Sequence, residues 1–111
     1  MAPARFGTAT YNRWYARQYM GRKYRWDGAQ YTALVAMWQR ESSWRHKARN
    51  PSGKYLGIPQ TSAAVVRGNG YTVAQYMASP EIQVEVGLRY IRARYGTPAK
   101  AWSFWRSHHW Y

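Results

Sequence analysis

The amino-acid sequence predicts a single, mainly α-helical domain. Between residues 27 and 41, Tyr31, Leu34, Val35 and Trp38 recur at the i, i+3, i+4, i+7 spacing of one helical face. A second long segment, from about residue 79 to 95, presents a broad apolar surface and begins and ends with typical helix-capping residues. The length of 111 residues is the usual size of one domain with one core.

The N-terminal third is expected to contain a tail and two helices. Residues 1 to 10 lack apolar periodicity and are predicted to be a flexible tail, which leaves residues 11 to 111 as the folded domain. A short helix is predicted from about Asn12 to Met20, before Gly21. The next helix is predicted to begin at Asp27, with Gln30 completing a capping box.

A loop is predicted from residue 42 to 60, because Asn50-Pro51-Ser52-Gly53 is a strong turn signal. Loops beside a rigid helix are frequent places for functional sites. Two short helices follow, with Thr61 and Thr72 as their predicted caps.

Two further helices complete the predicted fold. Ser79-Pro80 supplies the cap and first residue of the longer one, and Gly96 ends it. Thr97-Pro98 begins the last helix, which leads into an aromatic end, His108-His109-Trp110-Tyr111.

Only four acids occur in the chain, and three of them have structural explanations. Asp27 is the predicted cap, and at about 1.5 Å per helical residue it lies roughly 20 Å from Glu41, too far to act as a paired catalytic carboxylate. Glu81 complements the dipole at the start of its helix, and Glu85 can pair with Arg89 one turn later. Glu41 is the acid that remains for chemistry.

Glu41 extends the apolar face of its helix and stands near the C-terminal end. The negative pole of the helix dipole and partial burial both favour the protonated form, which a proton donor near neutral pH requires. The alternative is that Glu41 only forms a structural ion pair with one of the many arginines.

Composition limits the classes of function. The absence of cysteine excludes disulfides and thiolate metal sites. No apolar run reaches the roughly 20 residues of a membrane span, and the first residues lack the apolar region of a signal peptide. If the protein is exported, another route is therefore expected. The net charge of +13 indicates a polyanionic partner, such as nucleic acid, an anionic membrane or an acidic bacterial wall.

One catalytic carboxylate and many aromatic residues favour a particular glycosidase chemistry. Ordinary glycosidases use two carboxylates, whereas substrate-assisted cleavage of N-acetylated sugars needs only an acid. The seven Trp, 11 Tyr and two Phe suit a sugar-binding cleft, since aromatic faces pack on pyranose rings.

An ordered series of motifs resembles the soluble-lytic-transglycosylase-like catalytic domain, in the form found in actinobacterial secreted proteins and in tail proteins of their phages. The motifs are E-S-x-W from Glu41, N-P-S-G from Asn50, G-I-P-Q from Gly57 and Y-I-x-x-R-Y-G from Tyr90. The resemblance covers roughly residues 27 to 111. It implies a lysozyme-like fold with a sugar-binding cleft, and cleavage of the β-1,4 bond between N-acetylmuramic acid and N-acetylglucosamine in peptidoglycan.

The resemblance also implies the site residues. Glu41 is then the single catalytic acid, Ser42 and Gln60 contact the sugar near the scissile bond, and Tyr90 lines the cleft. Tyr55 and Trp102 are further expected substrate contacts. The family's Ala-Tyr-Asn motif is present only as Ala101-Trp102-Ser103, so two of its three residues differ.

The expected partners are peptidoglycan strands and anionic wall polymers, with the protein acting as a monomer on the cell wall, either extracellular or associated with a phage. No cofactor or metal is expected, because His46, His108 and His109 lack ligand spacing. If water attacks in place of the muramoyl hydroxyl, the same site is a muramidase. The alternatives are a nucleic-acid-binding module without catalysis, which the lack of a known motif disfavours, and a wall-binding domain that has lost activity.

Overall fold

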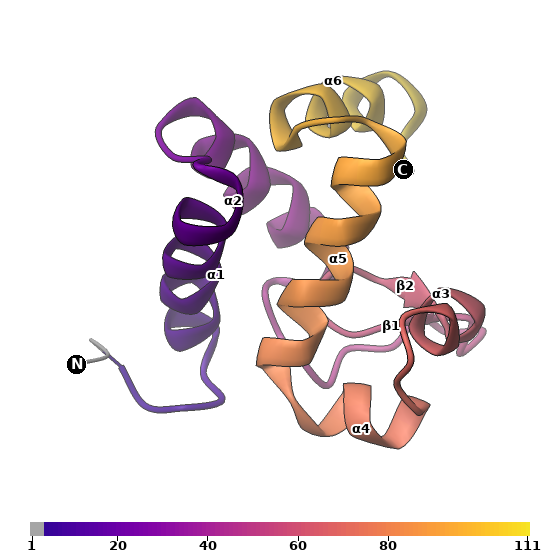
Figure 1. The fold of residues 1–111 in the computed structure, drawn as a ribbon. Coiled ribbons are helices and arrows are strands. Elements are labelled where there is room, and N and C mark those ends of the chain that lie inside the picture. Colours follow the sequence, from indigo (N-terminus) through magenta and orange to yellow (C-terminus); the bar gives the residue numbers. More distant parts are fainter. Residues whose placement is uncertain (1–3) are drawn as a thin grey trace.

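The computed structural model describes residues 4–111, and these residues form six helices and one small antiparallel sheet (Figure 1). In chain order the elements are α1 (Ala9–Tyr24), α2 (Ala29–Ser42), β1 (Tyr55–Leu56), β2 (Thr61–Ser62), α3 (Ala63–Gly68), α4 (Val73–Ala78), α5 (Pro80–Arg94) and α6 (Pro98–His108). The prediction of a mainly α-helical protein is therefore confirmed. No helix in this part of the chain is long and apolar enough to cross a membrane.

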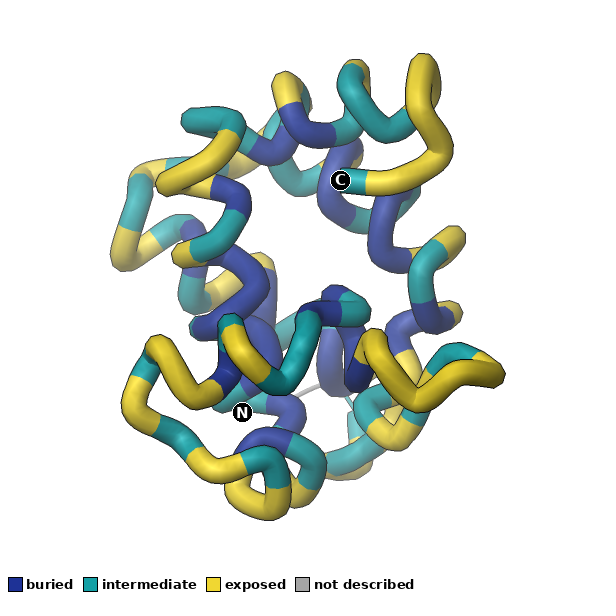
Figure 2. Tube along the Cα trace, turned by 90° about the vertical axis from the view of Figure 1, so that its right-hand side faces the viewer, coloured by how far each residue is buried: buried dark blue, intermediate teal, exposed yellow. Residues whose placement is uncertain are grey.

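Helix α5 runs through the middle of the molecule and joins two hydrophobic clusters. Helices α1, α4 and α6 each pack against α5 (Figure 1). Helix α2 packs against α6. The larger cluster consists of Ala16, Met20, Leu34, Met37, Trp38, Trp44, Ile58, Val84, Leu88, Ile91 and Ala101. The smaller cluster consists of Leu56, Val66, Tyr76 and Val86, around the hairpin, α3 and α4. Buried positions accordingly follow the inner helix faces, and exposed ones gather on the outer loops (Figure 2).

The apolar face predicted for residues 27 to 41 is confirmed in α2. Leu34 and Trp38 are fully buried in the larger cluster, and Tyr31 and Val35 pack against it. This burial fixes the rotation of α2 about its axis and thereby the direction in which its last turn presents Glu41.

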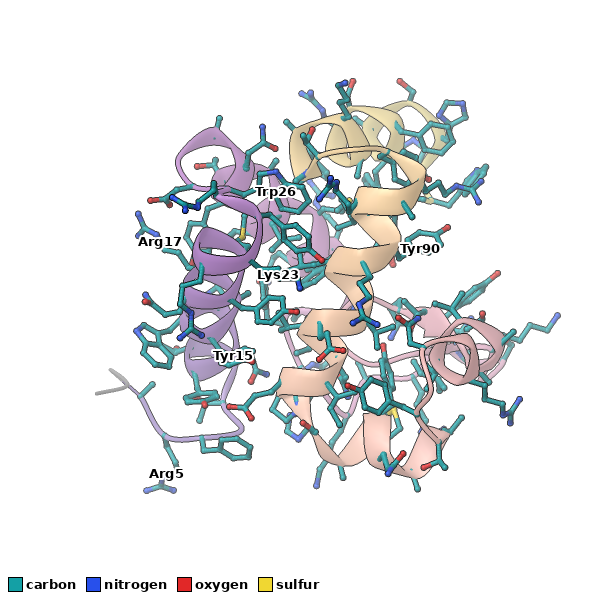
Figure 3. All side chains as sticks on the ribbon, viewed as in Figure 1. Arg5, Tyr15, Arg17, Lys23, Trp26 and Tyr90 are labelled. Carbon is teal, nitrogen blue, oxygen red and sulfur yellow. The ribbon has the colours of Figure 1, made fainter. Side chains whose placement is uncertain are left out.

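Helix α1 is longer than the sequence indicated. Thr8 accepts a hydrogen bond from the Tyr11 amide at 3.1 Å, so the helix begins at Ala9, inside the predicted tail. Gly21 does not end it, because the helix continues to Tyr24 with tyrosines packed toward α5. Tyr15 of α1, and Trp26 just after this helix, lie on the side of α1 that faces α5 (Figure 3). Residues 1 to 3 of the predicted tail lie outside the described residues.

The predicted capping box at Asp27 is wrong. Gly28 is the N-cap of α2, with no side-chain cap, and Asp27 instead pairs with Arg17 on α1 at 3.1 Å. The side chain of Gln30 accepts a hydrogen bond from the amide of Ala99 at 2.9 Å, and so stabilises the start of α6. Both side chains are used in contacts between elements that are distant in sequence.

The other predicted caps agree with the structure to within one residue. Thr72 forms a capping box, and Ser79-Pro80 and Thr97-Pro98 start α5 and α6 as expected. The cap of α3 is Ser62 and not Thr61, whose hydroxyl donates to the buried Tyr76 hydroxyl at 2.7 Å.

The region predicted as a loop, residues 42 to 60, contains the first strand of a hairpin, and the second strand, Thr61–Ser62, lies at the predicted start of the next helix. Tyr55 pairs with Ser62 and Leu56 with Thr61, and Arg49 forms an additional bridge to Leu56. The strands are two residues long, too short to show an alternating pattern in the sequence.

Candidate functional site

Glu41 is a half-buried carboxylate near the C-terminal end of α2, and no cation of the described part of the chain pairs with it. Its Oε1 atom accepts a hydrogen bond from Nε1 of Trp105 on α6 at 2.8 Å. The two ion pairs in the described part of the chain join Arg17 to Asp27 and Arg89 to Glu85. The alternative interpretation, that Glu41 forms a structural ion pair with an arginine, is thus not supported among residues 4–111.

The surroundings of Glu41 favour a protonated carboxyl. Burial raises the pKa of Glu41 above its ordinary value, and the Trp105 N–H opposes this by stabilising the charged form. A carboxyl with a raised pKa can hold a proton nearer neutral pH and donate it.

Glu41 faces a cavity of about 380 Å³. The other lining residues are Asn50, Tyr55, Gln60, His109, Trp110 and Tyr111. A neighbouring cavity of about 80 Å³ shares Tyr55, Gln60 and Tyr111 and also includes Tyr90. Aromatic rings and amide groups thus surround one acid, a composition suited to a sugar chain, with rings for its apolar faces and amides for its hydroxyls.

One wall of the larger cavity is the loop and hairpin between α2 and α3. Gln60 adopts a left-handed backbone with φ 56°, and its Nε2 donates to the Gly57 carbonyl at 2.8 Å and to Ala48 at 3.3 Å. Asn50 Oδ1 accepts from the Tyr55 amide at 3.2 Å, which closes the N-P-S-G turn. The loop therefore presents its cavity-lining residues from a hydrogen-bonded backbone.

A second wall of the cavity is the segment that follows α6, which contributes His109, Trp110 and Tyr111. The hydroxyl of Tyr111 accepts from Nε1 of the fully buried Trp38 and donates to the Pro59 carbonyl, both at 2.8 Å. Burial, followed by the nearby charge of Glu41, raises the pKa of Tyr111 well above its ordinary value. This single hydroxyl connects α2, the hairpin loop and the last residues of the chain beside the cavity.

The structure brings together four of the six predicted site residues. Glu41, Gln60 and Tyr55 line the larger cavity, and Tyr90 lines the smaller one. Tyr90 projects from α5 on the side away from α1 (Figure 3) and contacts the Tyr111 ring at a centroid distance of 5.6 Å.

The structure places Ser42 and Trp102 elsewhere. Ser42 is buried, and its hydroxyl donates to the Ile58 carbonyl at 2.7 Å, so it supports the loop and does not face the cavity. Trp102 does not line either cavity. It stacks on Trp105 at 5.4 Å and so lies behind the residue that contacts Glu41.

Sequence reasoning did not identify Trp105, His109, Trp110 or Tyr111 as parts of the site. These residues lie more than 60 positions after Glu41, and no local pattern links them to it. One signal in the sequence could have identified this region. The aromatic residues at the end of the chain do not belong to the apolar face of a predicted helix, so they were available to line a site.

No group of His, Asp or Glu residues in the described part of the chain could hold a metal ion. No family description, no curated protein and no solved structure matches this chain.

Proposed function

We propose that this protein is a lytic transglycosylase that cleaves the β-1,4 bond between N-acetylmuramic acid and N-acetylglucosamine in peptidoglycan. The observation that carries the proposal is a half-buried carboxyl with a raised pKa and no cation partner among residues 4–111, facing a cavity lined by aromatic and amide groups. We also propose the lysozyme-like fold class. It is supported by the position of the acid, which shares its cavity with Tyr55 and Gln60 of the hairpin loop and accepts a hydrogen bond from Trp105 of α6.

Glu41 is the one carboxylate among the side chains that line the cavity, which favours a substrate-assisted route. Asp27 pairs with Arg17, Glu81 accepts from the Tyr11 hydroxyl at 2.8 Å, and Glu85 accepts from the Tyr71 hydroxyl at 2.9 Å. None of these three acids lines the cavity. A mechanism with two carboxylates across the bond would require a second one there.

In the proposed reaction, the protonated Glu41 donates its proton to the glycosidic oxygen as the bond to the anomeric carbon breaks. The acetamido group of the muramoyl residue stabilises the developing positive charge. The Glu41 carboxylate then accepts the proton of the muramoyl C6 hydroxyl as that oxygen attacks the anomeric carbon and closes a 1,6-anhydro ring. Attack by water in place of this hydroxyl would make the same site a muramidase.

Digestion of purified peptidoglycan, followed by mass spectrometry of the products, tests the proposal. The wild type is expected to release 1,6-anhydromuramoyl ends, and Glu41→Gln to be at least about 100-fold slower, since general acid catalysis contributes about that much or more. Glu81→Gln is the matched control, because it changes a glutamate outside the cavity, and its activity should resemble the wild type.

Each other outcome has a defined meaning. Reducing muramic acid ends without the anhydro form would assign the site to a muramidase. Wild-type activity in Glu41→Gln would show that Glu41 is not the catalytic acid. No cleavage by the wild type would reject catalysis altogether.

A further inference from the structure

A third cavity, of about 320 Å³, lies in the segment between the end of α2 and the N-P-S-G turn. Its lining consists of Arg45, Lys47, Ala48 and Arg49. Three cationic side chains at alternate positions of one short segment therefore share one hollow.

These three cations have no acidic partner in the described part of the chain. Its two ion pairs involve Arg17 and Arg89, and the side chains of Arg45, Lys47 and Arg49 are exposed. The adjacent half-buried imidazole of His46 has a lowered pKa, because burial and then the charge of Lys47 disfavour its protonation. Like charges held together repel, so an anion in this cavity would relieve an unfavourable arrangement.

The backbone that carries these cations is held in place by hydrogen bonds. The amide and Nε of Arg45 both donate to the Ser42 carbonyl, at 3.1 and 3.2 Å. Buried Gln83 on α5 donates to the His46 carbonyl at 2.8 Å. Because the segment is already ordered, binding an anion there loses little backbone entropy.

The segment that carries the three cations is hydrogen-bonded to the wall of the Glu41 cavity. The Ala48 carbonyl accepts from the Gly57 amide at 2.7 Å and from Nε2 of Gln60, a residue of the Glu41 cavity. Asn50, the residue after Arg49, also lines that cavity. The three cations and part of the Glu41 cavity wall therefore belong to one hydrogen-bonded loop.

We propose that Arg45, Lys47 and Arg49 form a subsite for an oxyanion, a carboxylate or phosphate, carried by the glycan strand in the Glu41 cavity. Guanidinium groups bind both oxyanions through paired N–H donors, and the lysine adds a compact positive charge. In peptidoglycan, carboxylates occur on the peptide stems and phosphates on attached wall polymers. The identity of the strand rests on the proposed function, whereas the preference for an anion rests on the cavity itself.

The test measures binding in the inactive Glu41→Gln background, by calorimetry with soluble wall fragments at low salt. Lys47→Gln combined with Arg49→Gln removes two charges from the subsite and retains Arg45, whose Nε holds the Ser42 carbonyl. Lys23→Gln combined with Arg67→Gln removes two exposed charges outside this cavity and is the matched control. We expect the subsite pair to weaken binding about tenfold and the control pair less than about twofold, because only close charge pairs contribute strongly.

The fragments identify the anion. Glycan strands are compared with stems and polymers present, with stems removed, with polymers removed, and with both removed. The difference in affinity between the two variants should disappear when both stems and polymers are absent. If removing the stems alone reduces this difference, the oxyanion is a stem carboxylate; if removing the polymers alone reduces it, the oxyanion is a polymer phosphate. Equal losses in the two variants, or a difference that persists on bare glycan, would overturn the subsite. A wild type that binds in this pattern but cleaves no wall would reject the proposed function and leave the subsite standing.

Discussion

The protonation of Glu41 depends on two opposing interactions. Burial raises its pKa, and the hydrogen bond from Trp105 lowers it. Trp105→Phe keeps an aromatic ring on α6 and removes the N–H, so the pKa of Glu41 should rise further. Because a general acid works only while protonated, the fall of activity on the alkaline side should move to higher pH. The kcat/KM profile against pH measures this shift.

Trp102→Phe is the matched control for that profile. It makes the same change one turn earlier on α6, in a ring that stacks on Trp105 and has no bond to Glu41. Its alkaline limb should remain at the wild-type position. A profile of Trp105→Phe that is unchanged, or displaced to lower pH, would show that this hydrogen bond does not tune the acid.

Glu41 should also lower the stability of the protein at neutral pH. Its folded-state pKa is raised above the unfolded value of about 4.3, so its stabilising contribution is complete below that pH and is lost as the pH rises through the folded pKa. Glu41→Gln is uncharged at every pH and can still accept from Trp105. We therefore expect a higher Tm than the wild type at pH 7, and a difference that shrinks as the pH falls below about 4.

Asp27→Asn provides a comparison of opposite sign. The amide of Gly28 and then the Arg17 guanidinium lower the pKa of the Asp27 carboxyl, so its charged form contributes stability above the unfolded pKa. Asp27→Asn should give a Tm no higher than the wild type at pH 7. The Tm of both variants and of the wild type is measured at pH values from 3 to 8. A lower Tm for Glu41→Gln than for the wild type at neutral pH would contradict the expected destabilisation by Glu41.

Among the elements, α5 determines how closely the hairpin loop approaches α2. A Cβ on Gly87 would lie 2.7 Å from both the Pro59 Cβ and the Trp38 Cζ2, so the glycine allows this contact. Gly87→Ala should destabilise the fold by about 1–3 kcal/mol despite the better helix propensity of alanine, because a packed core resists an added methyl group. It should also reduce activity, since Pro59 precedes Gln60 in the cavity wall.

Gly68→Ala serves as the control, because Gly68 is also helical and no neighbour lies within 4 Å of its added Cβ. That substitution should be neutral or stabilising by up to about 1 kcal/mol. Chemical denaturation of both variants makes the comparison. Equal free energies of unfolding would mean that the Gly87 contact relaxes without loss.

The helix ends show what the sequence could and could not predict. Ser79-Pro80 and Thr97-Pro98 were predicted correctly because their side chains bond to amides three residues away. Asp27 and Gln30 have the same local pattern, but their side chains bond to α1 and α6. A local pattern cannot reveal a distant partner, so this prediction was wrong.

The predictions of the site residues also identified cavity-lining residues that are close in sequence to Glu41, and they missed those that are distant. Glu41, Tyr55 and Gln60 lie within 20 residues of one another, and sequence motifs placed them together. Trp105, which contacts Glu41, and the cavity wall that contains Tyr111 come from the other end of the chain, and they meet Glu41 only through tertiary packing. Sequence reasoning therefore predicted the acid and one wall but not the other wall.

At the scale of the whole molecule, the surface is strongly basic, with a net charge of +13. Sixteen of the 17 Lys and Arg side chains are exposed, with Arg13 half-buried, and two of the 17 form ion pairs. Such a surface produces a field that extends well beyond individual contacts and attracts polyanions. Cleavage of a neutral glycosidic bond does not require it, so we expect this charge to hold the protein on an acidic wall.

This expectation predicts that attachment and cleavage respond differently to salt. Exposed charges more than about 10 Å apart are screened at 0.1 M, so sedimentation with insoluble walls should fall steeply as salt rises. Cleavage of a short uncharged chitooligosaccharide by the Glu41 cavity, measured over the same series, should change much less, because its contacts are rings and amides. Wall binding that stays constant from low to high salt would leave attachment to the aromatic cavity alone, and the surface charge would then serve only to keep an aromatic-rich protein soluble.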